Sequence, residues 1–332
     1  MLINLKVFII KRLQTRESKE IGALVKWLIL KVQRSDQKLS QKFPYVVRVL
    51  VAEIVPDCPL GLSQNEVNTL SVMVPCIEKD KLILPYCLLG IQTNVLNKVR
   101  KITVVTDDDG FVPVYNGDNL QVINENTLLS NDLIHLLDKY VPRDRRGWVI
   151  KQILTFKFAY ESSDDCILVI DADTVLTKSR LFVHNGKQIL IPVVEYNHYD
   201  SLTTGLTWQG KGNPFGISFT CHHLVLQTQM VREMFDEIGG LYEGIKKWLE
   251  SANGNVWSPI SDMHSYGTWM LNSYPDRVVF ARWGNLRVSK TFFNTYRGIE
   301  AKEIFDQIVS RFKNYNSISF HHYLPDGYID PE

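Results

Sequence analysis

The sequence predicts an α/β fold in which a mixed, mostly parallel sheet is flanked by helices. From about residue 70 onward, short apolar runs rich in Val, Ile and Leu alternate with segments that have helical spacing. Such alternation is typical of parallel strands with helices on both faces. The chain has 332 residues, of which 45% are hydrophobic and 22% charged. This length allows one large domain with an appendage.

The expected elements follow one another in a regular order. Strands are expected at Leu70–Pro75, Ile102–Thr106, Leu120–Ile123, Ile167–Ile170, Ile189–Val194, Ser218–Leu226, Val278–Ala281 and Ile318–His321. Helices are expected at Asp80–Lys98, Asn131–Tyr140, Gly147–Tyr160, Gln227–Ile238, from Ser261 onward, and at Glu300–Lys313. The Pro- and Gly-containing stretch 56–61 is a natural linker. We therefore expect a helical N-terminal extension over residues 1–60 and the α/β domain over residues 65–332.

The N-terminal extension is basic. Residues 1–50 hold 11 Lys and Arg against 3 Asp and Glu, a net charge of +8, whereas the remainder carries a net charge of −7. Residues 5–41 have helical spacing with an apolar stripe and an adjacent Trp27. A basic amphipathic helix of this kind can lie on an anionic membrane, or it can pack on the body or on another subunit. The arm matches no nucleic-acid-binding motif, so no nucleic-acid partner is expected.

The five cysteines are scattered and form no C-x-x-C pair, which favours a reducing compartment. The apolar run 7–10 is too short for a signal peptide, and no stretch is long and apolar enough to cross a bilayer. We expect a cytoplasmic protein whose basic arm can touch the inner face of the membrane.

The most informative motif is Asp171-Ala172-Asp173-Thr174, directly after the apolar run 166–170. Side chains alternate along a strand, so the two carboxylates are expected on one side of it. Paired carboxylates at the end of a buried strand suit Mg²⁺ or Mn²⁺, ions that commonly hold phosphate groups. Ligands of open α/β sheets also bind at this edge. The alternative interpretation is a solvated acidic turn.

The order of these elements resembles that of nucleotide-sugar-dependent glycosyltransferases of the GT-A fold. Those enzymes open with a strand like 70–75 and reach an Asp-x-Asp motif after a hydrophobic strand about a hundred residues later, as at 167–174 here. The segments 147–154, 218–223 and 261–267 are similar to those of a poorly characterised bacterial branch. The resemblance covers about residues 68–325 and implies a GT-A-type, Rossmann-like fold.

The resemblance also implies a metal site and a nucleotide-sugar donor. In this family the second Asp of the motif binds Mn²⁺ or Mg²⁺ directly, which corresponds to Asp173. The first Asp reaches the ribose or a water on the metal, which corresponds to Asp171. A histidine after a late strand often completes the metal site, and His321 or His322 matches it. Since successive strand residues face opposite sides, at most one of the two is expected to be a ligand.

The resemblance assigns further roles. Asp262, at the start of a helix, matches the general base of inverting members; the alternative is a favourable charge in a first helical turn. Asp80 and Asp107 match positions that contact the nucleotide, whereas Lys151 and Gln152 match positions near the pyrophosphate. His222 and His223 are candidates for acceptor contacts, with one of the two expected to be buried.

Two other functions fit the same residues. Asp171–Val175 also matches the signature of haloacid-dehalogenase-type phosphatases, in which Asp171 would be the nucleophile. Several strand–helix units precede the motif here, and the later Gly-Asp-x-x-x-Asp motif of those enzymes is missing from the sequence. A non-catalytic sugar-nucleotide-binding module is the third hypothesis. The bacterial resemblance favours transfer of a hexose or related sugar to a glycan or lipid-linked acceptor in surface polysaccharide biosynthesis.

Overall fold

A five-stranded central sheet organises the protein. The computed structural model describes residues 68–108, 110–111, 118–192, 218–251, 261–295 and 299–331. The strand order is β3-β2-β1-β4-β8. The bounds are β1 Thr69–Pro75, β2 Lys98–Thr106, β3 Leu120–Asn124, β4 Cys166–Ile170 and β8 His223–Gln227. Strands β3, β2, β1 and β4 are parallel, and only β8 is antiparallel, paired with β4. The predicted mixed, mostly parallel sheet is confirmed.

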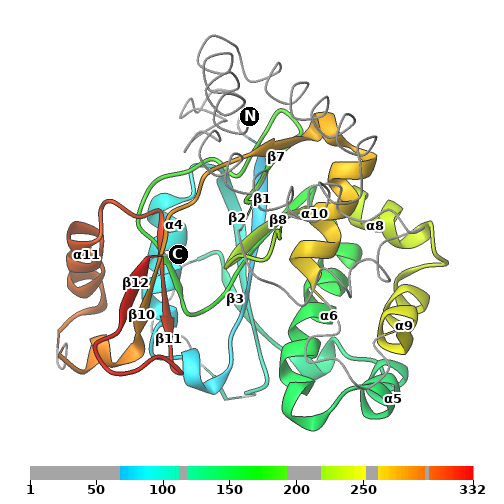
Figure 1. The fold of residues 1–332 in the computed structure, drawn as a ribbon, viewed down its shortest axis with the longest axis horizontal. Helices are drawn as coiled ribbons and strands as arrows, with labels where there is room; N and C mark the ends of the chain where they lie inside the picture. Colours follow the sequence, from blue (N-terminus) through cyan, green and yellow to red (C-terminus); the bar gives the residue numbers. More distant parts are fainter. Residues whose placement is uncertain are drawn as a thin grey trace, which may run out of the picture.

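Both faces of this sheet are buried, as the nearly continuous apolar runs of its strands predict. Along β4, Ile167 and Val169 belong to one hydrophobic cluster, whereas Leu168 and Ile170 belong to another. The first cluster is built by five helices on one face, shown on the right of Figure 1. These helices are α5 Asn131–Tyr140, α6 Arg146–Glu161, α8 Thr228–Asp236, α9 Leu241–Ser251 and α10 Asp262–Ser273.

The opposite face is covered by α4 (Leu84–Asn94), behind which lies a second sheet with the order β12-β10-β11-β5. The bounds of these strands are β5 Thr174–Leu176, β10 Asn285–Ser289, β11 Ser317–His321 and β12 Ile329–Pro331, and α11 (Ala301–Arg311) packs on the same layer. A Cβ added at Gly90 of α4 would lie 2.9 Å from the backbone nitrogen of Leu176. Gly90 therefore lets α4 approach β5 closely, and β5 directly follows the Asp-x-Asp motif.

A third, smaller sheet has the order β6-β7-β9, with β6 at Val183–His184, β7 at Lys187–Leu190 and β9 at Val278–Phe280. Short 3-10 helices lie at Glu78–Asp80, Glu125–Thr127, Arg143–Arg145, Pro275–Arg277 and Lys290–Thr295.

The structure corrects several predicted boundaries. The helix expected at Asp80–Lys98 is a short 3-10 turn followed by α4, which has Pro85 in its first turn and ends at Asn94, and Lys98 already belongs to β2. Pro fits only the first turn of a helix, so it marks the start. Helix α9 and strand β10 were not predicted. Gly239 and Gly240, with φ of 97° and 100°, separate α9 from α8, whose predicted end at Ile238 lies two residues beyond the observed end at Asp236.

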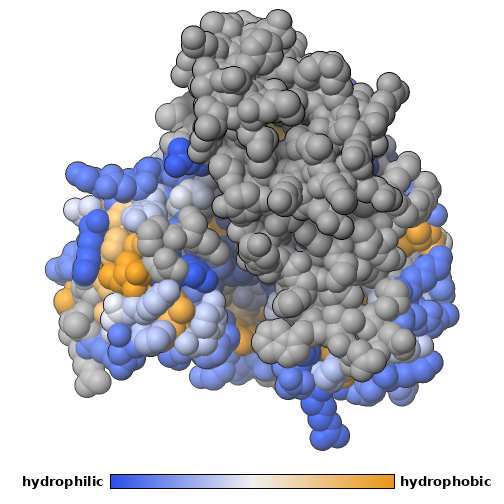
Figure 2. All heavy atoms as spheres, viewed as in Figure 1, coloured by the Kyte–Doolittle hydropathy of each residue, from blue (hydrophilic) through white to orange (hydrophobic). Residues whose placement is uncertain are grey.

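Some predictions lie outside the described residues. They are the basic N-terminal helix, the linker at 56–61, and the part of the strand expected at Ile189–Val194 that extends beyond residue 192. In the described part of the chain, no helix is both long and apolar enough to cross a membrane. The described surface in Figure 2 is mostly hydrophilic, with a few small apolar groups between the polar ones. Four cysteines are described, and all four are free.

Candidate functional site

The Asp-x-Asp motif forms a turn that joins the central sheet to the second sheet. The backbone N–H of Thr174 donates to the carbonyl of Asp171 at 3.0 Å. On one side of the turn, Asp171 N–H donates to the carbonyl of His222 at 3.0 Å; on the other, Phe320 N–H donates to the carbonyl of Asp173 at 2.8 Å. The two carboxylates lie close together, as predicted. The predicted reason was wrong, because both residues belong to the turn rather than to a strand.

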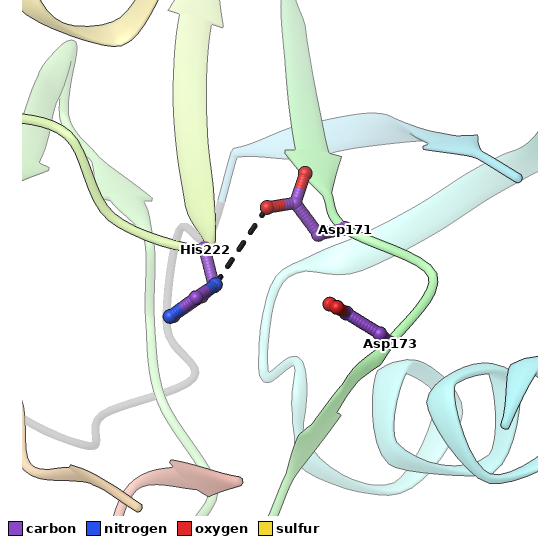
Figure 3. Close-up of side chains that lie close together, drawn as sticks. All are labelled: Asp171, Asp173 and His222. Atoms are coloured by element: carbon purple, nitrogen blue, oxygen red, sulfur yellow. Dashed lines mark ion pairs between the residues drawn. The ribbon is translucent and has the colours of Figure 1, made fainter. Parts of the chain in front are cut away.

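His222 completes a group that has the composition of a metal site. One ligand atom from each of Asp171, Asp173 and His222 lies within 4.8 Å of the others, and the three side chains converge in Figure 3. All three are half-buried. His222 precedes β8, and the antiparallel pairing of β8 with β4 places it opposite Asp171.

His321 lies beside the other carboxylate. It is the last residue of β11, which pairs antiparallel with β5, and its Nδ1 lies 3.4 Å from Asp173 Oδ2. His322 is exposed, and its Nδ1 lies 3.0 Å from Lys79 Nζ. The two adjacent histidines therefore face different surroundings, as the strand alternation predicts, and only His321 lies against the Asp-x-Asp turn.

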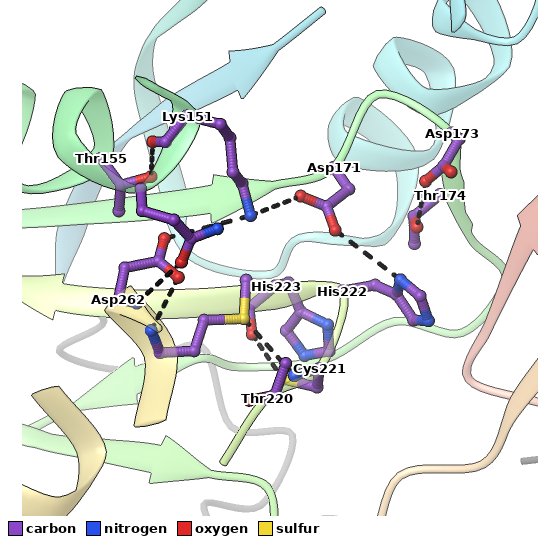
Figure 4. A network of polar contacts seen from close by, with 12 residues as sticks. Lys151, Thr155, Asp171, Asp173, Thr174, Thr220, Cys221, His222, His223 and Asp262 are labelled. Carbon is purple, nitrogen blue, oxygen red and sulfur yellow. Dashed lines mark hydrogen bonds and ion pairs between the residues drawn. The ribbon is translucent and has the colours of Figure 1, made fainter. Parts of the chain in front are cut away.

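Lys151 of α6 connects the Asp-x-Asp turn to Asp262 (Figure 4). Its Nζ lies 3.0 Å from Asp171 Oδ1 and 4.0 Å from Asp262 Oδ2. Burial disfavours the charged ammonium, but the carboxylates of Asp171 and Asp262 outweigh this effect and raise the pKa of Lys151. Burial likewise opposes ionisation of Asp171, but Lys151 and then His222 outweigh it, so the pKa of Asp171 is lowered. This lysine stays charged and holds Asp171 ionised.

Asp262 opens α10 and is almost fully buried, with 1% of its surface exposed. Ser261 caps this helix by accepting the N–H of His264 at 3.3 Å, as predicted. The side-chain oxygen of Gln152 accepts the N–H of Asp262 at 2.8 Å, so Gln152 contacts the start of α10. Asp262 Oδ1 accepts the N–H of Met263, whereas Oδ2 has no hydrogen-bond partner among the described residues.

The surroundings of Asp262 favour proton uptake. Burial raises the pKa of its carboxyl group, and Lys151 offsets this only in part. A carboxylate with a raised pKa and one oxygen without a hydrogen-bond donor is chemically able to accept a proton. Asp262 is therefore a buried carboxyl group with a raised pKa, beside the Lys151–Asp171 pair.

Asp80 and Asp107, which follow β1 and β2, have different surroundings. Asp80 lies in the 3-10 turn Glu78–Asp80 and is half-buried. Burial, followed by the charge of Asp173, raises the pKa of Asp80 to about 7. It therefore senses the negative potential of the Asp-x-Asp turn. Asp107 is exposed at the end of β2.

His223 is the buried member of its pair, as predicted. It is 2% exposed, and neither ring nitrogen has a hydrogen-bond partner among the described residues. Its ring lies 4.1 Å from that of Trp283. Burial and the neighbouring His222 lower the pKa of His223 to about 3, so its imidazole is neutral. His223 is therefore a buried residue that packs against Trp283.

Sequence reasoning did not identify His222 as a metal-site residue. The strand predicted at Ser218–Leu226 covers His222, whereas the observed β8 begins at His223, and the antiparallel pairing of β8 with β4 was not predicted. When β8 pairs antiparallel with β4, His222, the residue just before β8, lies opposite Asp171, the residue just after β4. The two-residue His-His sequence beside a strand was the available signal.

The residues present fit a divalent cation. Carboxylate oxygens suit Mg²⁺ and Mn²⁺, and imidazole nitrogens add affinity for transition metals. His321 lies beside this group, with its Nδ1 3.4 Å from Asp173 Oδ2, and its buried Nε2 has no hydrogen-bond partner among residues that the structure describes. Asp171, Asp173 and His222 are thus the described residues whose ligand atoms lie close enough together to hold one ion.

Comparisons with known proteins report similarity of fold. No protein-family model matches the chain, and no curated protein matches it. The solved galactosyltransferase LgtC in complex with donor and acceptor sugar analogues is similar at a TM-score of 0.41 and 11% identity, covering 75% of this chain and 86% of that one. Mouse xyloside xylosyltransferase 1, in its apo form, has a TM-score of 0.42 and 11% identity, covering 77% of this chain and 99% of that one. An active-site mutant of LgtC has a TM-score of 0.40 and 11% identity, covering 77% of this chain and 88% of that one.

Proposed function

We propose that this protein is a metal-dependent glycosyltransferase that moves a sugar from a nucleotide-sugar donor to an acceptor hydroxyl. The observation that carries this proposal is the convergence of Asp171, Asp173 and His222, whose ligand atoms lie within 4.8 Å of one another. They stand at the carboxyl end of β4, the edge at which open α/β sheets bind ligands. A Mn²⁺ or Mg²⁺ ion bound here would neutralise the charge that gathers on a departing diphosphate.

In the proposed reaction, the oxygen of the acceptor hydroxyl attacks the anomeric carbon of the donor sugar. The bond from that carbon to the diphosphate oxygen breaks, and its electron pair leaves with the nucleoside diphosphate. The hydroxyl proton goes to Asp262, whose unpartnered Oδ2 and raised pKa support the role of general base. Attack on the face opposite the leaving group inverts the anomeric configuration.

The remaining polar residues are proposed to hold the donor. Lys151, already charged next to Asp171, is suited to contact the negatively charged pyrophosphate. Gln152 holds the first turn of α10 in position. Asp80 and Asp107, after β1 and β2, are proposed to contact the nucleotide. A hexose or related sugar as donor, and a glycan or lipid-linked acceptor of surface polysaccharide, are the substrates that the sequence resemblance favours.

A thermal-shift panel of nucleoside diphosphates and sugar nucleotides, with and without Mn²⁺, tests the donor assignment. Ligands that bind only the folded form raise the melting temperature. At a concentration of 100 times Kd, the expected stabilisation is about 2.7 kcal/mol. We expect Mn²⁺-dependent shifts with one class of nucleotide. Absence of any shift across the panel, combined with hydrolysis of a generic phosphomonoester, would support the phosphatase alternative instead.

Replacement of Asp262 tests the base. Asp262→Asn keeps the size of the side chain but removes its ability to accept a proton. We expect the transfer rate to fall about 100-fold or more, the usual range for loss of a general base. Donor affinity, measured by titration calorimetry, should remain within a few-fold of wild type. Weakened donor binding with intact turnover would contradict the role.

The division of the chain is a proposal as well. We propose that residues 1–60 form a separate basic extension that contacts anionic membranes at the cytoplasmic face, and that residues 65–332 form the transferase domain. The net charge of +8 in residues 1–50 supports this. Deletion of residues 1–55 should reduce co-sedimentation with phosphatidylserine-containing vesicles but not with neutral ones. If the full chain and the chain without residues 1–55 co-sedimented equally with these vesicles, the arm would instead have a packing or oligomerisation role.

A further inference from the structure

One face of β11 is polar although it is buried. Ser317, Ser319 and His321 alternate with Ile318 and Phe320 along this strand, and all five residues are buried. Ile318 and Phe320 belong to the hydrophobic cluster of the second sheet. Because side chains alternate along a strand, the two serines and His321 share the opposite face. A buried polar group costs free energy unless it is hydrogen-bonded, so the serines of this face require partners.

Ser319 belongs to a row of buried hydrogen bonds that ends at Asp173. The pairing of β11 with β5 places Ser319 opposite Thr174, and their hydroxyl oxygens lie 2.9 Å apart. Thr174 Oγ1 lies 3.3 Å from Asp173 Oδ1 (Figure 4). At the other end of the row, Ser319 Oγ lies 3.3 Å from Asn285 Oδ1. Thr174 and Ser319 are both 0% exposed, so the centre of the row is shielded from solvent.

The hydrogen bonds next to Asn285 have a fixed direction. Trp283 Nε1 can only donate, and it donates to Ser317 Oγ at 2.8 Å. Ser317 directs its own proton to Asn285 Oδ1, at 2.7 Å. This oxygen therefore has a donor without Ser319, and the Ser319 proton is available to Thr174.

The number of protons in the row limits which contacts can be hydrogen bonds at the same time. The hydroxyls of Thr174 and Ser319 carry two protons, but they border three contacts: to Asp173, to each other and to Asn285. One end of the row always lacks a proton, which agrees with a central contact of 2.9 Å and two end contacts of 3.3 Å. A hydrogen bond to a carboxylate is about twice as strong as one between neutral groups. Both protons therefore point toward Asp173.

We propose that Thr174 and Ser319 are positioning residues that fix the orientation of the Asp173 carboxylate. Ser319 donates to Thr174, and Thr174 donates to Asp173 Oδ1, so the second sheet holds this oxygen in place. The other oxygen, Oδ2, lies 3.4 Å from His321 Nδ1. This inference rests on the proposed function, since Asp173 is the carboxylate expected to bind the metal. Hydrogen-bond partners of a metal ligand set its orientation, and their loss typically lowers metal affinity by about 10–100-fold.

The test measures Mn²⁺ binding to the full chain without nucleotide, by electron paramagnetic resonance of the free ion. Thr174→Val removes the hydroxyl but keeps the branched shape of the side chain, and should weaken Mn²⁺ binding by about 10–100-fold. Thr174→Ser keeps the hydroxyl and should bind Mn²⁺ within a few-fold of wild type. Equal Mn²⁺ affinity of wild type and Thr174→Val would overturn the proposal.

Thr177→Val is the matched control. Thr177 follows β5, is 5% exposed, and donates its hydroxyl to the carbonyl of Tyr315 at 2.7 Å. Its replacement removes a buried hydroxyl hydrogen bond of the same segment that does not involve Asp173. The two valine variants should lower the urea midpoint by similar amounts, but only Thr174→Val should lower Mn²⁺ affinity. An equal loss of Mn²⁺ affinity in both variants would mean a purely structural role and refute the proposal.

Ser319→Ala tests the direction of the protons. If they point toward Asp173, Thr174 keeps its own hydrogen bond to Asp173 in this variant. The loss of Mn²⁺ affinity should then be less than about 10-fold, below the range expected for Thr174→Val. With the opposite direction, removal of Ser319 would give Asp173 a new donor, and Mn²⁺ affinity would rise above that of wild type. Such a rise would contradict the proposal.

Failure of this inference and failure of the proposed function have different signatures. Loss of Mn²⁺ affinity in Thr174→Val, without stabilisation of the protein by any sugar nucleotide, would keep the positioning role and refute the transferase. Mn²⁺-dependent stabilisation by sugar nucleotides, with unchanged Mn²⁺ affinity in Thr174→Val, would refute only the positioning role. Absence of Mn²⁺ binding to the wild-type protein would overturn this inference, and the donor panel would then decide the transferase alone.

Discussion

The two carboxylates of the candidate site differ in how their charge is balanced. Asp171, at the end of the central sheet, has the Lys151 ammonium at 3.0 Å from its Oδ1. Asp173, at the start of the second sheet, has His321 as its only ion-pair neighbour among the described residues. The turn thus joins one carboxylate whose charge is compensated by a fixed cation to another that has only a histidine beside it.

This difference predicts which carboxylate of the proposed metal site would bind an ion more strongly. The attraction between Lys151 and Asp171 already stabilises the ionised form of Asp171, so a bound dication adds less there. Asp173 contributes to the negative potential that raises the pKa of Asp80 to about 7, and it has no lysine or arginine within ion-pair distance in the described part of the chain. Asp173 should therefore be the stronger metal ligand, with Asp171 positioned between the ion and Lys151.

The largest expected effect comes from removing the charge of Asp173. Asp173→Asn should reduce metal-dependent transfer by at least about 100-fold, because loss of an outer partner alone costs about 10–100-fold in affinity or activity. Asp171→Asn should reduce Mn²⁺ affinity less than Asp173→Asn does, because Lys151 already neutralises part of the charge of Asp171. Turnover and Mn²⁺ titrations of both variants provide the test. Equal losses in Mn²⁺ affinity would show that Lys151 does not distinguish the two carboxylates.

Removal of Lys151 tests directly how much this cation stabilises the carboxylates beside it. Lys151→Met leaves Asp262 buried without its cation, so the free energy of unfolding at pH 8 should fall by about 3 kcal/mol, the low end for a broken buried pair. The loss should shrink as the pH falls, because Asp262 then takes up a proton and no longer needs a partner. Urea unfolding at several pH values measures both effects.

Lys157→Met is a matched control for this experiment. Lys157 is on the same helix and pairs with Glu161, whose side chain is half exposed. Exposed pairs of this spacing contribute only about 0.3–0.5 kcal/mol. Combining Lys151→Met with Asp262→Asn should recover part of the lost stability. A loss with Lys151→Met as small as that of the control would mean that Asp262 is already protonated in the native protein.

The sequence predicted the parallel strands and the position of the Asp-x-Asp motif, because both follow from local patterns, namely apolar runs and the acidic pair after them. The partnership of each carboxylate with a histidine depends on two antiparallel pairings, β4 with β8 and β5 with β11, between segments far apart in the chain. Local periodicity carries no information on such pairings. The same limit applies to β10, which joins β11 in the second sheet, and to Lys151, whose contact with Asp262 requires α6 and α10 to pack together.

His322 and His223, the sequence neighbours of His321 and His222, show a second contrast. His322 follows the last residue of β11 and is exposed, whereas His223 begins β8 inside the apolar cluster that also contains Phe182 and Val225. A pKa of about 3 for His223 means that it remains neutral in the folded protein when unfolded His223, near its ordinary value of 6.5, takes up a proton. The stability contributed by neutral His223 is therefore present above pH 6.5 and is lost as the pH falls toward 3.

The smallest expected effect is that of His223→Leu. At pH 7 the free energy of unfolding should change by less than about 1 kcal/mol, since a buried group without a hydrogen-bond partner is replaced by an apolar one. At pH 5, which is 1.5 units below the pKa of unfolded His223, the folded wild-type protein excludes a proton that the unfolded chain binds. The variant lacks this penalty, so its free energy of unfolding should exceed that of wild type by about 2 kcal/mol. His322→Leu should change stability by less than about 0.5 kcal/mol at pH 7, as exposed substitutions do. Urea titrations at both pH values measure these differences. If the free energies of unfolding of His223→Leu and wild type differed by the same amount at pH 5 and pH 7, folded His223 would have to bind a proton at pH 5 as the unfolded residue does. The contrast between buried His223 and exposed His322 would then be lost.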